Sequence, residues 1–110
     1  MAKTYKVLAQ SAPSATTATD IYTAGAGVQT IVSTITVANR GSSSSAYRIA
    51  IRPNAEALAN KHYIAYDIAL AGNDTTAITI GATLDASDII TVYASTADLS
   101  FNVFGSEITA

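Results

Sequence analysis

The stretch Tyr63-Ile-Ala-Tyr-Asp-Ile-Ala-Leu-Ala71, followed by Gly72-Asn-Asp74, decides the fold class of this chain. Its large apolar side chains occupy every second position and are separated by small or polar residues: Ile64, Tyr66, Ile68 and Leu70. Because successive side chains of a strand point to opposite faces, this period predicts a strand with one buried face and one face available for contacts. No recognisable catalytic group accompanies the pattern.

The same two-residue period returns along most of the sequence and predicts seven or eight short strands. The segments that show it are 4–9, 20–23, 30–39, 46–52, 62–71, 75–80, 89–95 and 99–103. Segment 30–39 is dense in β-branched residues, so we expect it to be a central strand or one covered by a partner. Gly41 and the serines that follow it form a turn, which predicts that 30–39 and 46–52 pair as a hairpin.

Alternation also assigns side chains to faces. In segment 30–39 the residues expected to share one face are Ile31, Ser33, Ile35 and Val37. In segment 46–52, Tyr47, Ile49 and Ile51 are expected to point inward, and Arg48 and Arg52 outward. Further along the chain, Ile78 and Ile80 are expected inward, and Ile90 and Val92 alternate with Thr91 and Tyr93.

Two stretches lack this period. Segment 11–19 is small and polar and contains Pro13, so we expect a loop or an extended arm. Segment 53–61 combines Pro53 with Ala, Glu and Leu, which predicts a helical turn or an excursion loop. Many short strands without a long helix predict an all-β fold, an antiparallel β-sandwich that is jelly-roll-like, made by one domain over residues 1–110.

Composition suggests a thin core and a need for partners. Ala and Thr together supply about a third of the 110 residues, and Trp is absent. Such side chains bury little apolar area, so each strand stabilises less than a Leu-rich strand would. Oligomerisation or docking on a larger surface compensates for a thin core, and we therefore expect a homo-oligomer or a docked subunit.

The charges argue against several classes of protein. Charged residues make up 13% of the chain and the net charge is −2. The six cations are scattered rather than gathered in a patch, so nucleic-acid binding is not expected: Lys3, Lys6, Arg40, Arg48, Arg52 and Lys61. The absence of cysteine excludes disulfides and thiolate chemistry. No apolar run is long enough for a membrane helix, and Gln10, Ser11 and Pro13 interrupt any signal-peptide core, so we expect a soluble, unprocessed chain.

Candidate catalytic and metal-binding residues are few. His62 is the only histidine, and its neighbours Asn60 and Lys61 favour an exposed surface position over a catalytic triad. Asp85 with Asp88, and Asn73 with Asp74, are expected to form turns rather than a calcium site, which needs more oxygen ligands. The remaining carboxylates show no linking motif: Asp20, Glu56, Asp67, Asp98 and Glu107. We therefore expect no catalytic residue, no metal and no cofactor.

A candidate interface remains. Arg48 and Arg52 lie four residues apart on one strand face, and Asp67 lies on the polar side of the following strand. Two interpretations stay open: a cross-strand ion pair at the surface, or an intersubunit contact. Six tyrosines against two phenylalanines favour interaction surfaces, because tyrosine has an apolar body and a polar tip. The residues assigned to this candidate interface are Arg48, Arg52, Asp67, Tyr47, Tyr63 and Tyr66.

Several strand-and-turn motifs carry a resemblance over most of the chain, from about Tyr5 to Thr109. They are Ile35-Thr-Val-Ala-Asn-Arg-Gly41, Tyr47-Arg-Ile-Ala-Ile-Arg-Pro53, Tyr63-Ile-Ala-Tyr-Asp67, Ala71-Gly-Asn-Asp74, Val92-Tyr-Ala-Ser-Thr96 and Leu99-Ser-Phe101 with Gly105-Ser-Glu107. With these motifs the chain resembles a group of small virion structural proteins of tailed bacteriophages, including cyanophages. The resemblance implies a non-enzymatic subunit, assembled in the host cytoplasm and present in many copies on the virion.

Two roles follow as expectations from that resemblance, the first of them favoured, and a third role of a different class stays open beside them. The first is a capsid cement or decoration protein that bridges subunits of the major capsid protein. The second is an accessory of the neck, tail or baseplate, or a fibre-associated module. The third is a host-receptor or glycan-binding module, for which the candidate contacts are Tyr22, Tyr47, Tyr63, Tyr66 and Tyr93.

Overall fold

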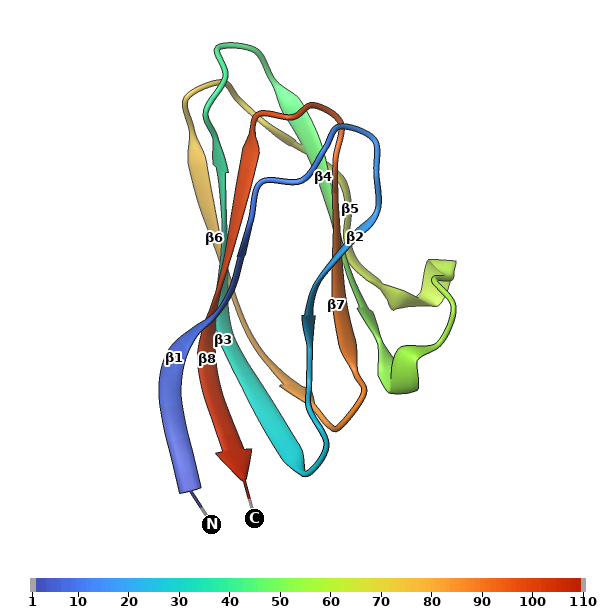
Figure 1. Cartoon of the computed structure of the whole chain (residues 1–110). Helices are drawn as coiled ribbons and strands as arrows, with labels where there is room; N and C mark the ends of the chain where they lie inside the picture. Colours follow the sequence, from blue (N-terminus) through green and yellow to red (C-terminus); the bar gives the residue numbers. More distant parts are fainter. Residues whose placement is uncertain (1, 110) are drawn as a thin grey trace.

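The computed structural model describes residues 2–109 and has two packed four-stranded antiparallel sheets (Figure 1). This arrangement confirms the expected β-sandwich; the ends of the expected domain, Met1 and Ala110, lie outside the described residues. The strands are β1 (Ala2–Ser11), β2 (Thr19–Thr23), β3 (Val28–Asn39), β4 (Ser45–Arg52), β5 (Tyr63–Leu70), β6 (Thr75–Leu84), β7 (Ile89–Ala94) and β8 (Leu99–Thr109). Within residues 2–109, no helix has the length and apolar character needed to cross a membrane.

The strand order is that of a jelly roll. Sheet A has the order β1-β8-β3-β6 and sheet B the order β2-β7-β4-β5. The pairs β1 with β8, β2 with β7, β3 with β6 and β4 with β5 are all antiparallel and nest inside one another. The chain is therefore one long antiparallel ribbon folded over itself, and among the strands of residues 2–109 only the β4–β5 connection stays within one sheet.

The expected hairpin between β3 and β4 is wrong. β3 pairs with β6 and β8 in sheet A, whereas β4 pairs with β5 and β7 in sheet B. The buried Asn39 fixes the crossing: its Nδ2 donates to the carbonyls of Ser43 and Leu70, and its Oδ1 accepts from the N–H of Gly41. Turn chemistry predicted the loop correctly, but a turn sequence does not say whether its two strands share a sheet.

A row of β-bulges crosses sheet A and changes the predicted faces. Leu8 of β1 and Ser33 of β3 are extra residues in their ladders, and β6 has an extra residue beside Gly81, whose φ is +57°. A bulge moves all following side chains to the other face. Consequently Ile31 is partly exposed while Val32 is fully buried, which corrects the expectation that Ile31 shares a face with Ile35.

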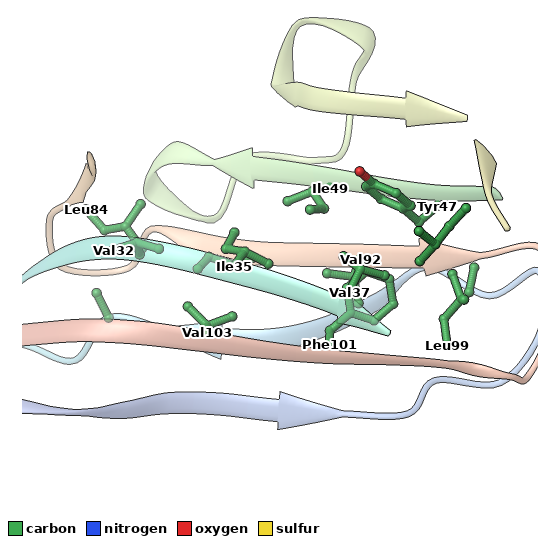
Figure 2. Close-up of a cluster of buried hydrophobic side chains, with 14 residues drawn as sticks. Val32, Ile35, Val37, Tyr47, Ile49, Leu84, Val92, Leu99, Phe101 and Val103 are labelled. Atoms are coloured by element: carbon green, nitrogen blue, oxygen red, sulfur yellow. The ribbon is translucent and has the colours of Figure 1, made fainter. Parts of the chain in front are cut away.

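The core lies between the sheets (Figure 2). Its largest fully buried apolar side chains come from β3, β4, β7 and β8: Val32, Ile35, Val37, Ile49, Ile90, Val92, Leu99, Phe101 and Val103. Tyr47 packs edge-on against Phe101, with ring centroids 6.4 Å apart. The inward positions expected for Tyr47 and Ile49 are therefore confirmed, and Ile78 and Ile80 pack against this core from the edge strand β6.

The irregular stretches are fixed loops. Residues 12–18 connect β1 in sheet A to β2 in sheet B, with Pro13 buried and the Thr16 N–H donating to the carbonyl of Ala94 at 2.8 Å. Of the two expectations for 11–19, the loop is therefore what the structure has. Between β4 and β5 the chain leaves sheet B in an excursion with two 3-10 turns, η1 (Pro53–Ala55) and η2 (Asn60–His62), as expected (Figure 1).

Candidate interaction surface

Two register shifts in the pairing of β5 with β4, a β-bulge at Asp67 and an extra residue at Ile64, decide which side chains β5 exposes. Tyr47 pairs with Ile68, but Ile49 pairs with Ala65, so two residues of β5 lie opposite Arg48. Asp67 has a φ of +51°, a conformation that aspartate tolerates better than most residues. The bulge turns Ala65 toward the core and leaves Tyr66 beside Arg48 on the outer face of sheet B.

The expectation that all four large apolar residues of β5 lie on a buried face is therefore wrong. Only Leu70 is buried, whereas the exposed fractions of Ile64, Tyr66 and Ile68 are 48%, 52% and 44%. Two causes act together: the bulge reverses the faces within the strand, and β5 is the edge of its sheet. An alternating pattern shows neither a bulge nor an edge position.

Arg48 lies between aromatic rings from the two neighbouring strands. Its guanidinium carbon is 4.3 Å from the ring centroid of Tyr66 on β5 and 4.2 Å from that of Tyr93 on β7. Both distances are typical of cation–π contacts. Tyr66 in turn packs edge-on against Tyr63, with centroids 4.8 Å apart.

Asp67 completes the contacts of Arg48. The Arg48 Nε donates to Oδ1 at 2.6 Å and Nη2 donates to Oδ2 at 3.3 Å, which is a two-point pairing. The hydrogen bond to Asp67 raises the pKa of Arg48, so the group stays charged. The expected cross-strand ion pair is thus present for Arg48, and three side chains hold the guanidinium in one orientation.

Arg52 has a different partner from the one the sequence suggested. Its Nη2 donates to Asp20 of β2 at 2.8 Å, its Nε donates to the Thr91 hydroxyl, and its Nη1 donates to the Glu56 carbonyl. Thr91 also donates to Asp20. Arg52 therefore joins β4 to its neighbour β7, to the edge strand β2 and to the excursion loop, and its side chain is only 13% exposed.

Tyr47 is removed from the candidate interface because only 4% of it is exposed. The two expectations for Tyr47, an inward position and a surface contact, exclude each other, and the inward position is the observed one. We call the outer face of sheet B around Arg48 the β5 surface: Arg48, Tyr63, Ile64, Tyr66, Asp67 and Tyr93. Ile68 lies opposite the inward-pointing Tyr47, so it belongs to the other face, where the edge position of β5 leaves it exposed. Asn60, Tyr63 and Tyr66 line a shallow hollow at one end of the β5 surface.

His62 is buried, which corrects the expectation of an exposed histidine. Its Nδ1 accepts the Ala59 N–H at 3.0 Å, so the neutral ring carries its proton on Nε2, which faces the Glu56 carboxylate at 3.2 Å. The hydrogen bond from His62, together with Lys61 at 3.4 Å, lowers the pKa of Glu56. His62 thus fixes the excursion loop; both ring nitrogens are engaged there.

The aspartates near the β6–β7 connection form turns, as expected. Asp88 accepts the N–H groups of Asn54 and Asp85, each at 2.8 Å, and Asp85 accepts the N–H of Ala86. Asp74 likewise accepts the N–H of Thr75. Within residues 2–109, no group of three potential metal-ligating side chains is gathered in one place.

One polar cluster had no signal in the sequence. The Tyr22 hydroxyl of sheet B crosses the sandwich to Glu107 at 2.6 Å and to Thr30 at 2.7 Å, and Lys6 pairs with Glu107 at 2.9 Å. Burial, helped by the hydrogen bond to Glu107, raises the pKa of Tyr22 to about 12. The same hydrogen bond, with that of Lys6, lowers the pKa of Glu107. This cluster joins the two sheets, so Tyr22 is not free for surface recognition.

Comparison with protein-family models, with curated proteins and with solved structures finds no match to this chain. Its function therefore has to be inferred from the residues and their geometry.

Proposed function

We propose that this chain is a non-enzymatic structural subunit of a phage virion. It decorates the capsid by docking its β5 surface on another virion protein, and the major capsid protein is the partner we favour. The observation that carries the proposal is the β5 surface itself. There, the exposed Tyr66 packs on an arginine that is already held in place, and Ile64 of the same strand is also exposed. The phage class comes from the resemblance of the strand-and-turn motifs.

The β5 surface has the composition of a protein–protein contact. Tyrosine and arginine are enriched at interfaces and among the residues that contribute most binding energy. Tyr66 and Ile64 of β5 expose apolar area, and docking would remove this area from water. The surface therefore offers a central polar anchor together with apolar surroundings.

Pre-organisation favours binding through this surface. Ordering a free arginine at an interface costs about 0.5–1.5 kcal/mol of side-chain entropy. Arg48 is already ordered by Tyr66, Tyr93 and Asp67, so most of this cost is met during folding. A subunit that must bind many equivalent positions on a particle benefits from such a fixed contact.

The chemistry of the remaining polar groups supports a structural role. His62 uses both ring nitrogens within the excursion loop, and the carboxylates of Asp85 and Asp88 accept backbone N–H groups. These side chains serve the loops they lie in. The proposal accordingly assigns no reaction to them.

The test is binding to particles that lack the protein. Purified chain is added to virions from a deletion strain, and bound copies are counted by quantitative mass spectrometry. Wild-type protein is expected to bind, and Tyr66→Ser to bind at least about tenfold more weakly, as for a central aromatic contact. Tyr5→Ser is the matched control, because Tyr5 is 76% exposed on sheet A. Equal losses for both variants, or no binding by wild type, would contradict the proposal.

Copy number separates this role from the second candidate, a neck, tail or baseplate accessory. Hundreds of copies per particle support decoration, whereas a few to a few dozen support the accessory role. The exposed Tyr66 and Ile64 serve either partner equally, so the count is the deciding measurement.

The hollow beside Asn60, Tyr63 and Tyr66 is the observation that favours the third candidate, a glycan or host-receptor module. Aromatic rings with a neighbouring amide are suited to sugar contacts, since rings cover apolar faces and amides bond hydroxyls. Binding to host cells that Asn60→Ala abolishes, while particle binding stays intact, would support this function instead.

A further inference from the structure

Four strands form the edges of the two sheets: β1 and β6 in sheet A, and β2 and β5 in sheet B. An edge strand presents a row of backbone N–H and C=O groups to which another strand can pair. Natural proteins protect such edges with charges, short strands, bulges or covering loops. The four edges of this protein differ in how far they use these devices.

Three of the edges are protected. β1 carries Lys3 and Lys6, and the five-residue β2 carries Asp20. β5 is interrupted by the bulge at Asp67, which also places a carboxylate on that strand. Each of these edges would bring a charge close to any strand that paired with it.

The β6 edge is different. Its ten residues, Thr75–Leu84, include no charged residue and no proline. The bulge beside Gly81 leaves residues 75–79 in uninterrupted register with β3. The outer face of the strand has small side chains, while Ile78 and Ile80 on the inner face are only partly buried. In Figure 1, β6 lies at the open side of sheet A with no strand beyond it.

We infer that β6 is a self-association edge: the β6 strands of two copies pair antiparallel about a two-fold axis and join the two A sheets into one continuous sheet. A two-fold axis perpendicular to the sheet makes the two strands antiparallel without further adjustment. Such pairing brings no charge into the joint, and it covers the remaining exposed area of Ile78 and Ile80. Threonine and β-branched pairs across the joint are favourable cross-strand neighbours.

The other edge of sheet A is a poorer partner. Pairing of β6 with the β1 strand of a second copy would bring Lys3 and Lys6 to the joint. It would also be a head-to-tail contact, which leaves a free β1 and a free β6 at its ends and continues into a filament. The lysines on β1 are the kind of residue that prevents this growth.

β6 would thus be the surface through which the homo-oligomer expected from the thin core forms, separately from particle binding. Dimerisation concerns the free protein and a different sheet from the β5 surface. If the free protein does not dimerise, docking on the particle through Tyr66 is still expected. If docking fails, dimerisation through β6 is still expected.

The first experiment is sedimentation equilibrium of the free protein with single charge variants. Wild type is expected to be a monomer–dimer system, and Thr79→Lys to weaken dimerisation by about tenfold, since like charges oppose each other across the joint. Gln10→Lys, which adds the same charge to the exposed β1 edge, is the matched control and is expected to dimerise like wild type. Unchanged thermal unfolding of both variants shows that the monomer is intact.

Mixing oppositely charged variants adds a second readout. Thr79→Lys and Thr79→Glu are each expected to be mainly monomeric, and an equimolar mixture is expected to regain dimer. Since the chain has no cysteine, Ala77→Cys or Thr79→Cys should also give a disulfide-linked dimer on oxidation, whereas Gln10→Cys should not.

Three results would overturn the inference. If the wild-type chain stays monomeric at high concentration, the β6 strands of two copies do not pair. Loss of association in both Thr79→Lys and Gln10→Lys, with species larger than dimers in wild type, indicates β6–β1 growth instead. A dimer that Thr79→Lys leaves intact but Tyr66→Ser disrupts indicates association through the β5 surface.

Discussion

The edge strands β5 and β6 end their respective sheets and have opposite designs. β5 carries a bulge, a carboxylate and exposed aromatic and aliphatic side chains, and its partner arginine is held by three neighbours. β6 carries no charge, and its outer side chains are small. β5 therefore exposes side chains at its edge, whereas β6 exposes mainly backbone groups. The comparison shows that two edges of one sandwich can expose different chemical groups, because each sheet has its own edges.

The two strands differ most in how they contribute to the core. Leu70 of β5 is 5% exposed, whereas Ile78 of β6 is only partly buried. Leu70→Ala should lower the free energy of unfolding by about 2–4 kcal/mol and Ile78→Ala by roughly half as much or less, since the cost follows buried area and cavity size. Urea unfolding of both variants at a concentration where the protein is monomeric measures the difference. Equal losses would mean that the β6 edge is as fully packed as the end of β5.

The shape of the β5 edge depends on the bulge at Asp67, where the backbone has a positive φ. Asp67→Val should lower the free energy of unfolding by about 1–2 kcal/mol relative to Asp67→Gly, because a β-branched residue is strained at positive φ. Both variants lose the ion pair with Arg48, so their difference in chemical denaturation isolates the backbone contribution. If the two unfold alike, β5 is able to straighten its bulge at no cost.

The stack around Arg48 should matter little for stability and much for binding. Arg48→Lys keeps the charge but loses the two-point pairing and the planar contact with both rings. Because the pair is close to the surface and screened by solvent, we expect only a small loss in the free energy of unfolding. Particle binding should fall by a larger factor. A variant that loses stability and binding in the same proportion would show that the stack serves the fold alone.

Of the two edges, only the region beside β5 should respond to acid. The pKa of Glu56 is lowered from its ordinary value of 4.5 by the hydrogen bond with His62 and by Lys61. Its contribution to the excursion loop is therefore present above about pH 4.5 and is lost as the pH falls through the lowered folded-state pKa. β6 has no titratable side chain.

Amide hydrogen exchange measured at several acidic pH values and corrected for intrinsic rates tests this difference. Protection in residues 53–62 should decline with falling pH, while protection along β6 should hold. In Glu56→Gln, the protection of residues 53–62 should depend less on pH. An equal loss of protection in both regions would instead indicate global acid unfolding.

Several features could be predicted from the sequence because they depend on neighbouring residues. Alternation identified every strand of the sandwich, and Pro53 and the Gly72-Asn-Asp74 turn marked connections correctly. Asp85 and Asp88 were correctly assigned to a turn. Such features follow from one or two residues and their spacing, and distant contacts do not change them.

The candidate surface could be predicted only in part. The Arg48–Asp67 pair follows from strand order and charge, but the partner of Arg52 is Asp20, thirty-two positions away on β2. The position of Tyr93 beside Arg48 depends on β7 lying next to β4. Pairings of this kind require the sheet order, which local periodicity does not contain.

The sequence by itself determined the all-β class, the approximate positions of the strands and most of the residues that face the core, because side-chain alternation is a property of the strand alone. Only the tertiary structure decided which strands share a sheet, where bulges reverse the faces, and which edges remain unpaired. Ile64 and Tyr66 are an example. The two-residue alternation correctly predicted a strand, but the bulge at Asp67 and the edge position of β5 leave both side chains exposed. The physical reason is that a strand's exposure is set by its neighbours across the sheet, and those neighbours come from distant parts of the chain.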